Sequence, residues 1–315
     1  MKFDAPQFRS EAEARKYIEA LRWPGGRVCP KCGSIGSEYE TKREGRYRCG
    51  AKECRKDFTV MTGTVMEASH VKLTVWLMAF YLMASSKKGM SAHQLHRTLD
   101  VTYKTAWFLA HRIRAAMANG GLTGPLGGPG QIVEADETYF GKVENPRTVS
   151  TTGRAFVKRG SGPANKRAVV ALIERGGQAR VFHVAEANRE TVEKIVRENV
   201  HPKSRLHSDE SRLYTKVGAE LGSHETVKHS AGEYARGDVH TNSAEGFFGV
   251  FKKGMTGVYQ HCAEKHLHRY VGEYEFRHNT RTKLGFTDAM RAQRAVEGIE
   301  GKRLTYRRTN GAAVA

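Results

Sequence analysis

The sequence predicts a multidomain protein in which a cysteine-rich ribbon and a helical region precede a mixed α/β domain. Three observations support this prediction. Two close cysteine pairs lie within residues 29–54, and two capped helical segments joined by a short turn follow within residues 91–117. From residue 131 onward, several strands precede alternating helices and strands. The 315 residues are enough for two or three domains with one substantial core.

Composition points to a polyanionic partner. The formal net charge is +19, and an excess of this size favours phosphate contacts and counterion release on a nucleic acid. The alternative is a basic protein with no specific partner. No apolar run reaches the ~18 residues of a membrane span. The amino-terminal residues lack the apolar segment of a signal peptide, so a cytoplasmic location without membrane contact is expected.

Residues 1–24 are predicted to form an amphipathic helix, and residues 25–66 a zinc ribbon. The cysteine spacing is C-x2-C, sixteen residues, C-x4-C. Two thiolate pairs on tight turns can complete a closed tetrahedral Zn²⁺ site, which leaves no position for catalysis. The alternative is four buried or redox-active cysteines, and the second pair is two residues wider than usual. The predicted zinc ligands are Cys29, Cys32, Cys49 and Cys54. The fifth cysteine, Cys262, is expected to be a buried, unreactive thiol.

Residues 67–118 are predicted to form a helical DNA-binding region. Ser91 can cap the helix AHQLHRTL, and a short turn at residues 100–102 precedes YKTAWFLAHRIRAAM. This outline is typical of a helix-turn-helix, whose second helix reads DNA from its amino-terminal end. Tyr103, Lys104 and Thr105 occupy that position. The alternative is an ordinary helical hairpin.

A Gly-rich linker is predicted at residues 119–130, followed by an α/β domain at 131–295. Its pattern gives the order β-β-β-α-β-α-β-α-α, with a basic loop at 148–167 and a Gly-Gly hairpin turn near 176. Three strands followed by alternating helices and strands match the ribonuclease-H-like architecture, a mixed sheet flanked by helices. Residues 296–315 are predicted to be a disordered tail.

Three carboxylates stand at informative places in this domain. Asp136 lies in a predicted strand, Asp209 follows a short strand, and Glu245 lies near the start of a helix, with 35 residues between it and Asp209. Carboxylates brought together from such segments can hold two divalent cations about 3.5–4 Å apart, which act on a phosphate. Their hard oxygen ligands suit Mg²⁺.

Close neighbours compete for these roles. Glu134 and Asp136 share one face of the predicted strand and Glu137 points to the other, so Glu134 is the alternative ligand. Asp209 is followed by Glu210, but the motif favours Asp209.

On the following helix, Asn242, Glu245 and Lys252 lie roughly on one face, which suits a helix that follows a DNA backbone. Asn242 could instead cap the helix, and Lys252 and Lys253 could simply be solvated. The nearby histidines are expected to be structural or to contact phosphate; they are His207, His240 and His261.

The ordered set of motifs resembles a known family. The landmarks are RYRCGAKECRKDFTVMTGTVME, LHRTLDVTYKTAWFLAHRIR, VEADETYFGK, HSDESRLY, HTNSAEGFFGVFKKGMTGVYQH and LHRYVGEYEFRHNTR. Over residues 5–290 the chain resembles bacterial insertion-sequence transposases of the DDE superfamily, in the branch with an amino-terminal zinc ribbon. The resemblance implies a ribonuclease-H-like catalytic domain that uses Mg²⁺ or Mn²⁺. It also implies Asp136, Asp209 and Glu245 as metal ligands, with Asn242 and Lys252 in the same signature.

The function expected from this resemblance is binding of insertion-sequence ends, cleavage of double-stranded DNA and strand transfer into target DNA. Lys252 and Lys253 join residues 103–105 as expected DNA contacts. A homo-oligomer on DNA is expected, because two ends must be handled together, with the protein associated with the nucleoid. The alternatives are a nuclease without strand transfer and a DNA-binding regulator with an inactive catalytic domain.

Overall fold

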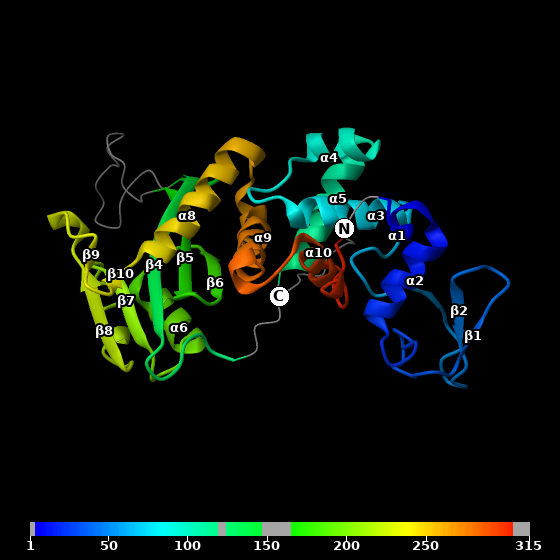
Figure 1. Cartoon of the computed structure of the whole chain (residues 1–315), viewed down its shortest axis with the longest axis horizontal. Helices are drawn as coiled ribbons and strands as arrows, with labels where there is room; N and C mark the ends of the chain where they lie inside the picture. The colour runs from blue at the N-terminus through cyan, green and yellow to red at the C-terminus, as the bar shows by residue number, and fades with distance from the viewer. Residues whose placement is uncertain (1–3, 119–123, 147–164, 305–315) are drawn as a thin grey trace. The chain divides into compact units, whose positions relative to one another are not determined.

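The computed structural model describes residues 4–118, 124–146 and 165–304 (Figure 1). The chain forms two compact units. One comprises residues 120–279, and the other combines residues 1–119 with residues 280–315. Most of the predicted basic loop at 148–167 lies outside the described residues.

The unit of residues 120–279 is built on a five-stranded sheet with the order β6-β5-β4-β7-β8. β4, β5 and β6 are antiparallel neighbours, whereas β7 runs parallel to β4 and β8 parallel to β7. The strands are β4 (Ile132–Lys142), β5 (Lys166–Glu174), β6 (Ala179–Val184), β7 (Arg205–Asp209) and β8 (Ser223–Val227). This mixed sheet confirms the ribonuclease-H-like fold class, and the turn at residues 175–178 confirms the predicted hairpin.

Helices cover both faces of this sheet (Figure 1). On one face, Val169, Ala171 and Ile173 of β5 pack against α8 (Asn242–Gly254) and α9 (Leu267–Asn279). On the other, Val170 and Leu172 pack with α6 (Arg189–Asn199) and α7 (Thr215–Gly218). The near-continuous apolar run of β5 follows from burial on both sides. Phe247, Phe248 and Phe251 of α8 are all buried in the core on the first of these faces.

Short elements complete this unit. They are the 3-10 turns η1 (His229–Ala231) and η3 (Glu264–His266), the strands β9 (Ala235–Arg236) and β10 (Val239–His240), and the π-helical turn η2 (Met255–Tyr259).

Side chains of α9 protect the edge strand β6. The Asn279 amide accepts a hydrogen bond from the Ala179 N–H at 2.7 Å and donates one to the Ala179 carbonyl at 2.9 Å. The Glu275 carboxylate accepts the Val181 N–H at 2.8 Å, and burial raises its pKa to about 7. An open strand edge invites pairing with other chains, so these bonds replace a missing neighbouring strand.

The other unit begins with α1 (Pro6–Arg9) and α2 (Glu11–Arg22), followed by a three-stranded antiparallel ribbon. The ribbon strands are β1 (Glu38–Glu40), β2 (Arg46–Cys49) and β3 (Asp57–Thr59). Tyr47 and Phe58 are buried between ribbon and helix, where the Phe58 ring packs edge-on against Trp23. The Tyr47 hydroxyl donates to Glu19 of α2 at 2.7 Å. The ribbon therefore shares its small core with α2.

The helical region contains α3 (Leu73–Ser85), α4 (Ala92–Leu99) and α5 (Tyr103–Met117). Ser91 accepts the Gln94 N–H, so the predicted cap of α4 is present, and Thr102 caps α5 by accepting the Thr105 N–H. Asp100 adopts a left-handed φ of 50° and ends α4. α4 and α5 therefore form the predicted helix–turn–helix outline.

The carboxyl-terminal boundary differs from the prediction. Residues 280–304 belong with the amino-terminal unit, not with the α/β domain predicted to reach 295. η4 (Thr282–Leu284) and α10 (Asp288–Glu297) form here, and α10 packs against α3 and α5. The Val65 N–H donates to the Ile299 carbonyl at 3.0 Å, so the chain is ordered beyond 296. α3 is apolar around its circumference and needs cover on several sides, which α10 supplies.

The predicted linker at 119–130 is also shorter than expected. Leu126 is buried in the α/β unit, and its backbone pairs with that of Val200. Residues 119–123 and the last part of the predicted tail, 305–315, lie outside the described residues.

Candidate metal centres and DNA-binding surface

The four paired cysteines converge in the ribbon. Their Sγ atoms all lie within 4.8 Å of one another, with Cys29 and Cys54 at 3.8 Å and Cys32 and Cys49 at 3.6 Å. Zn–S bonds of about 2.3 Å in a tetrahedron place neighbouring sulfurs about 3.8 Å apart. The cluster therefore fits one zinc ion.

The wider second cysteine pair keeps the geometry of the first. Gly33 and Arg55 each follow the second cysteine of a pair, and both adopt a left-handed φ, of 78° and 50°. In each pair, the backbone N–H of the first cysteine donates a hydrogen bond to a carbonyl just beyond the second cysteine. Cys29 donates to the Ser34 carbonyl at 2.9 Å, and Cys49 donates to the Lys56 carbonyl at 3.0 Å. The two extra residues thus bulge within the loop without displacing the ligands.

The predicted DNA-reading residues lie at the start of α5. Tyr103 is 45% exposed and stacks on His93 of α4 with ring centroids 4.3 Å apart. Lys104 is also exposed. The Thr105 hydroxyl instead lies 2.9 Å from that of Thr102, within the helix cap. Tyr103 and Lys104 are placed to meet a partner, whereas Thr105 mainly completes the turn.

Asp136 and Asp209 come together on adjacent strands. β4 and β7 are parallel with Glu134 opposite His207, so the register extended by two residues sets Asp136 opposite Asp209. Neighbouring strands lie about 4.8 Å apart. Asp209 ends β7, where its carboxylate accepts the Ser211 N–H at 3.0 Å. Asp136 accepts the N–H of the next residue at 2.8 Å.

Mutual repulsion and burial perturb both carboxyl groups. Burial, together with the charges of Asp209, Glu137 and Glu245, raises the pKa of Asp136 to about 8. Burial also raises the pKa of Asp209. Because like charges crowded in a low-dielectric site disfavour ionisation, a bound cation would stabilise the ionised forms. Of these causes, the charge of Glu245 contributes least to the raised pKa of Asp136.

Glu245 lies in the first turn of α8 and is partly exposed. Its Oε1 is 3.4 Å from His229 Nε2 and 3.3 Å from the Thr241 hydroxyl. The His229 turn is itself anchored by Glu210, which accepts the Ser230 and His229 N–H groups, and these bonds lower the pKa of Glu210 to about 2. Glu210 is therefore a loop anchor, consistent with the preference for Asp209 as the ligand.

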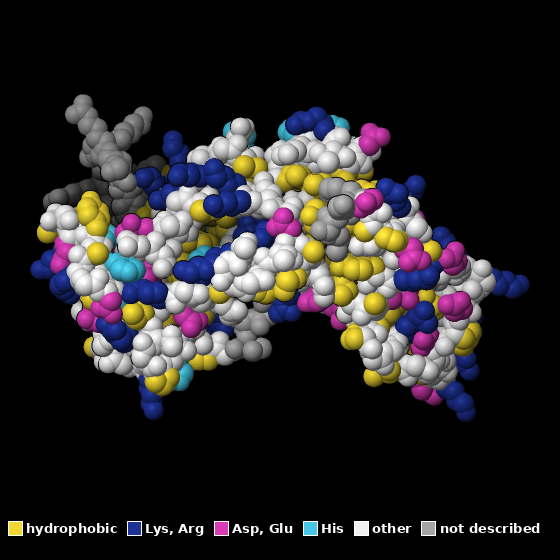
Figure 2. Space-filling view, viewed as in Figure 1, with side chains coloured by type: hydrophobic (Ala, Val, Ile, Leu, Met, Phe, Trp, Pro, Cys, Tyr) yellow, Lys and Arg dark blue, Asp and Glu magenta, His cyan; other side chains and the backbone are white. Residues whose placement is uncertain are grey.

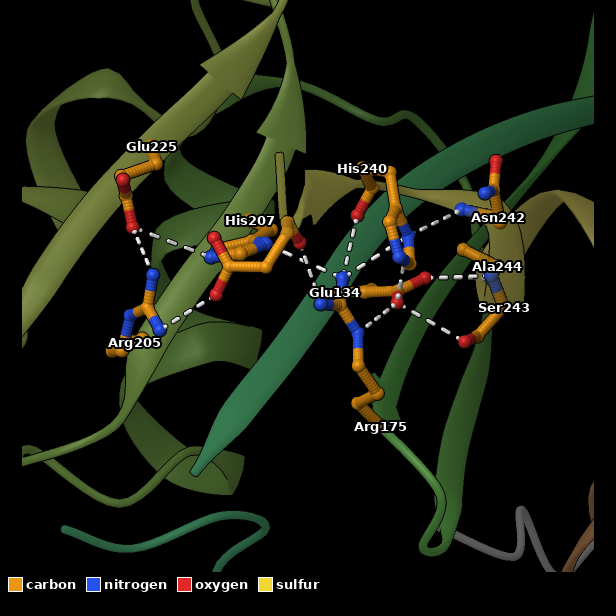
Figure 3. Close-up of polar contacts among 10 residues, drawn as sticks. Glu134, Arg175, Arg205, His207, Glu225, His240, Asn242, Ser243 and Ala244 are labelled. Atoms are coloured by element: carbon orange, nitrogen blue, oxygen red, sulfur yellow. Dashed lines mark hydrogen bonds and ion pairs between the residues drawn. The ribbon is translucent and has the colours of Figure 1, made fainter. Parts of the chain in front are cut away.

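The other two acidic residues of β4 have separate roles. Glu137 faces the opposite side of the sheet, as predicted, and accepts the Tyr214 hydroxyl at 2.8 Å. Glu134 is fully buried and paired with Arg175 at 2.9 Å (Figure 3). It also accepts hydrogen bonds from the first turn of α8. The structure therefore does not favour Glu134 as the alternative metal ligand, since its oxygens already have protein donors.

The remaining predicted residues of the signature lie along α8. Asn242 is exposed and its side chain makes no cap, because Thr241 is the cap position and Glu134 bonds the first-turn N–H groups. Lys252 and Lys253 are exposed. Figure 2 shows Lys and Arg side chains gathered around the position of α8. This surface suits a phosphate backbone.

The nearby histidines and Cys262 differ in burial and in their contacts. His207 is fully buried and His240 is partly buried, and both contact Arg175 within hydrogen-bonding range, which supports a structural role. His261 is exposed. Cys262 is half-buried rather than buried, with its thiol donating to the Ala263 carbonyl.

Within the described ranges, the four cysteines are the only group of three or more His, Cys, Asp or Glu residues close enough to share one metal ion. Asp136, Asp209 and Glu245 do not form such a group in this structure.

Known proteins match both units. Residues 9–57 match the transposase zinc-ribbon domain, and residues 125–279 match the ISXO2-like transposase domain. The chain is therefore similar to a transposase zinc ribbon in its amino-terminal part and to an ISXO2-like transposase domain in its α/β unit. It is also 29% identical over 289 residues to an uncharacterized protein in transposable element ISH50 of Halobacterium salinarum, covering 88% of this chain and 94% of that protein.

Two solved structures show weaker likeness. The Mos1 transposase paired-end complex with left transposon end is 12% identical, with a TM-score of 0.27 over 70% of this chain and 74% of that one. The Mos1 strand transfer complex is 12% identical, with a TM-score of 0.22 over 64% and 74%. Across the described parts of the chain, no helix has the length and apolarity needed to cross a membrane.

The raised pKa of Asp136 gives a pH prediction for the protein without added divalent cation. An unfolded Asp releases its proton near pH 3.8, but the folded chain holds this one until about pH 8. Stability therefore falls as pH rises from about 4 to about 8. We expect Asp136→Asn to stabilise the chain at pH 8 more than at pH 5, by at least about 1.4 kcal/mol, the equivalent of one pKa unit. Urea unfolding of zinc-loaded protein measures this, and an equal effect at both pH values would contradict it.

Proposed function

We propose that this protein is a DDE transposase that binds the ends of its insertion sequence, cleaves the DNA and joins the freed ends to target DNA. The observation that carries the proposal is the match of residues 125–279 to the ISXO2-like transposase domain, in which the strand register sets Asp136 opposite Asp209. Glu245, the third proposed ligand, lies in the first turn of α8, which packs against β4.

The three carboxylates would hold two Mg²⁺ or Mn²⁺ ions. Such a pair of ions activates an attacking oxygen and stabilises a leaving oxygen at a phosphate. Anchored strand ends and a helix first turn keep the carboxylates rigid, so a phosphodiester can be aligned with its nucleophile. Water is the nucleophile when the element end is cut, and the resulting 3′-hydroxyl is the nucleophile when that end joins target DNA. The same residues serve both steps.

DNA is the substrate that fits the surroundings of this site. Lys252 lies two helical turns beyond Glu245 on α8, with Lys253 beside it, and both are exposed. Residues seven apart share a helix face, so Lys252 can meet the backbone phosphate of the strand that enters the carboxylate site. Asn242, exposed at the start of α8, is placed to contact the same strand.

Strand transfer separates this proposal from its alternatives. Purified protein is incubated with a duplex that ends in the inverted repeat flanking the gene, together with a target plasmid and Mg²⁺. A transposase gives both a nicked end and a joined product. A nuclease gives the nick alone, and a DNA-binding regulator gives neither. Pairing of two ends also predicts a homo-oligomer on DNA, which the mass of the protein–DNA complex tests, and a nucleoid-associated protein in the cell.

The helix-turn-helix gives a prediction about end recognition. We expect Lys104→Ala to weaken binding of the element end and to reduce the slope of log K against log salt by about 1, because one phosphate contact is lost. Lys194→Ala is the matched control, since it removes one exposed charge from α6 of the other unit. Fluorescence anisotropy at several salt concentrations measures both. An unchanged slope for Lys104→Ala would favour the helical hairpin without a DNA role.

A further inference from the structure

We propose that Glu134 and Arg175 are positioning residues that fix Glu245 relative to Asp136, an inference that rests on the proposed function. Glu134 lies on β4, two residues before Asp136 and on the same face. The N–H groups that it accepts, those of Ser243 and Ala244, come immediately before Glu245 on α8. One buried carboxylate therefore joins the strand that carries the first proposed ligand to the helix turn that carries the third.

The start of α8 lacks a cap of its own. Thr241 occupies the cap position, but its side chain accepts no backbone N–H. Glu134 takes that role from the sheet, accepting Ser243 N–H at 2.7 Å and Ala244 N–H at 3.2 Å, while the Ser243 hydroxyl donates at 3.0 Å (Figure 3). A negative charge at a helix amino terminus also interacts favourably with the helix dipole. The position of the first helical turn therefore depends on Glu134.

Arg175 holds Glu134 from the turn between β5 and β6. Its Nε donates to Glu134 at 2.9 Å, and its other nitrogens donate to the Asp238 carbonyl at 2.6 Å and the His240 carbonyl at 3.1 Å (Figure 3). His207 on β7 lies 3.4 Å from the guanidinium, and burial beside Arg175 lowers the His207 pKa, which favours the neutral ring. Arg175 therefore links the carboxylate to β7 and to the segment that leads into α8.

The chemistry of this cluster requires a carboxylate. The groups that hydrogen-bond to Glu134 are all donors: one guanidinium, two backbone N–H groups and a hydroxyl. A carboxylate accepts at both oxygens, whereas an amide of the same shape turns an NH₂ group toward a donor. Glu134→Gln should therefore release the first turn of α8 without changing the volume of the side chain.

A matched control exists in the same unit. Glu273 of α9 is also fully buried, paired with Arg277, and accepts the Tyr259 hydroxyl at 2.6 Å. Arg277 and Tyr259 lie on α9 and η2, outside the first turn of α8. Glu273→Gln therefore removes a buried charge of the same kind without loosening the connection between β4 and α8.

The experiment measures Mn²⁺ binding to the zinc-loaded full chain by electron paramagnetic resonance, at a temperature at which thermal unfolding shows every variant to be folded. We expect Glu134→Gln to weaken Mn²⁺ binding about 10- to 100-fold, the range typical of residues that orient metal ligands. Glu273→Gln should lower the melting temperature but leave Mn²⁺ affinity unchanged. If Glu134→Gln fails to fold, Arg175→Lys provides the same test, because an ammonium cannot reproduce the three-way contacts of the guanidinium.

The outcomes separate this inference from the proposed function. Wild-type affinity in both Glu134→Gln and Arg175→Lys would overturn the positioning role while leaving the metal site standing. An equal loss in Glu273→Gln would also overturn it, because the effect would then follow from general destabilisation. If the wild-type chain binds no Mn²⁺, or if Asp136→Ala binds it as tightly, the proposed carboxylate site is wrong and the inference falls with it.

Discussion

Alanine at Asp136, Asp209 or Glu245 is expected to abolish both Mg²⁺-dependent cleavage of an element end and its transfer to target DNA. Each change removes a ligand at a site where cation binding supplies several kcal/mol of charge stabilisation. A loss of about 4 kcal/mol corresponds to about 10³-fold in rate. Because the same carboxylates serve both steps, cleavage and joining should fall together. Gel assays with a duplex end measure cleavage, and a pre-cleaved end with a 3′-hydroxyl isolates joining.

Binding of the element end should survive these substitutions. In the absence of divalent cation the carboxylates repel phosphate, so the variants should bind at least as tightly as the wild-type chain. Glu137→Gln is the control, because its carboxylate faces Tyr214 on the other side of the sheet, and it should keep measurable cleavage. Wild-type cleavage by Glu245→Ala would show that the helical ligand is misassigned. Activity in all three alanine variants would place the site elsewhere.

The sequence predicted most of the site because strands impose a strict alternation of faces. On β4, Val133 and Ala135 join the core beneath α6, so Glu134 and Asp136 must point to the opposite face, toward α8. The same alternation separates Glu137 from Asp136. Cysteine spacing and helix caps are likewise local signals, which is why the ribbon and the α4–α5 pair were predictable.

Interactions between distant segments could not be predicted from local patterns. The sequence suggested Glu134 only as an alternative ligand, because its four hydrogen bonds to α8 and Arg175 form only in the folded sheet. Arg175 sits in a hairpin turn, where an arginine usually faces solvent. His229 has no motif that links it to Glu245. The packing of α10 against α3 could not be predicted either, because the sequence of an amphipathic helix does not specify which apolar surface the helix covers.

Loss of zinc is expected to unfold the ribbon while leaving the α/β unit folded. The four thiols fit a tetrahedral ion, and apparent binding free energies of structural zinc in small domains are about 10–16 kcal/mol. The ribbon's short strands bury too little apolar surface to replace that contribution. Cys49 is fully buried in the cluster, so Cys49→Ser should release the zinc. The purified wild-type chain should contain one zinc ion, and the variant close to none, by elemental analysis.

The consequences of zinc loss should extend to α2 but not to the carboxylate site. Tyr47 bonds to Glu19, and Phe58 packs against Trp23, so an unfolded ribbon removes the partners of that helix. Limited proteolysis should then cut between residues 25 and 66, while residues 124–146 and 165–279 stay protected. Cys262→Ser is the matched control, because this cysteine lies outside the cluster and should keep both zinc and protease resistance. The assignment of the zinc ligands would be contradicted if Cys49→Ser still held one zinc ion per chain. It would also be contradicted if the wild-type chain, kept reduced and away from chelators, contained no zinc. Since no cluster ligand belongs to the α/β unit, Mn²⁺ binding by the carboxylates should persist in Cys49→Ser.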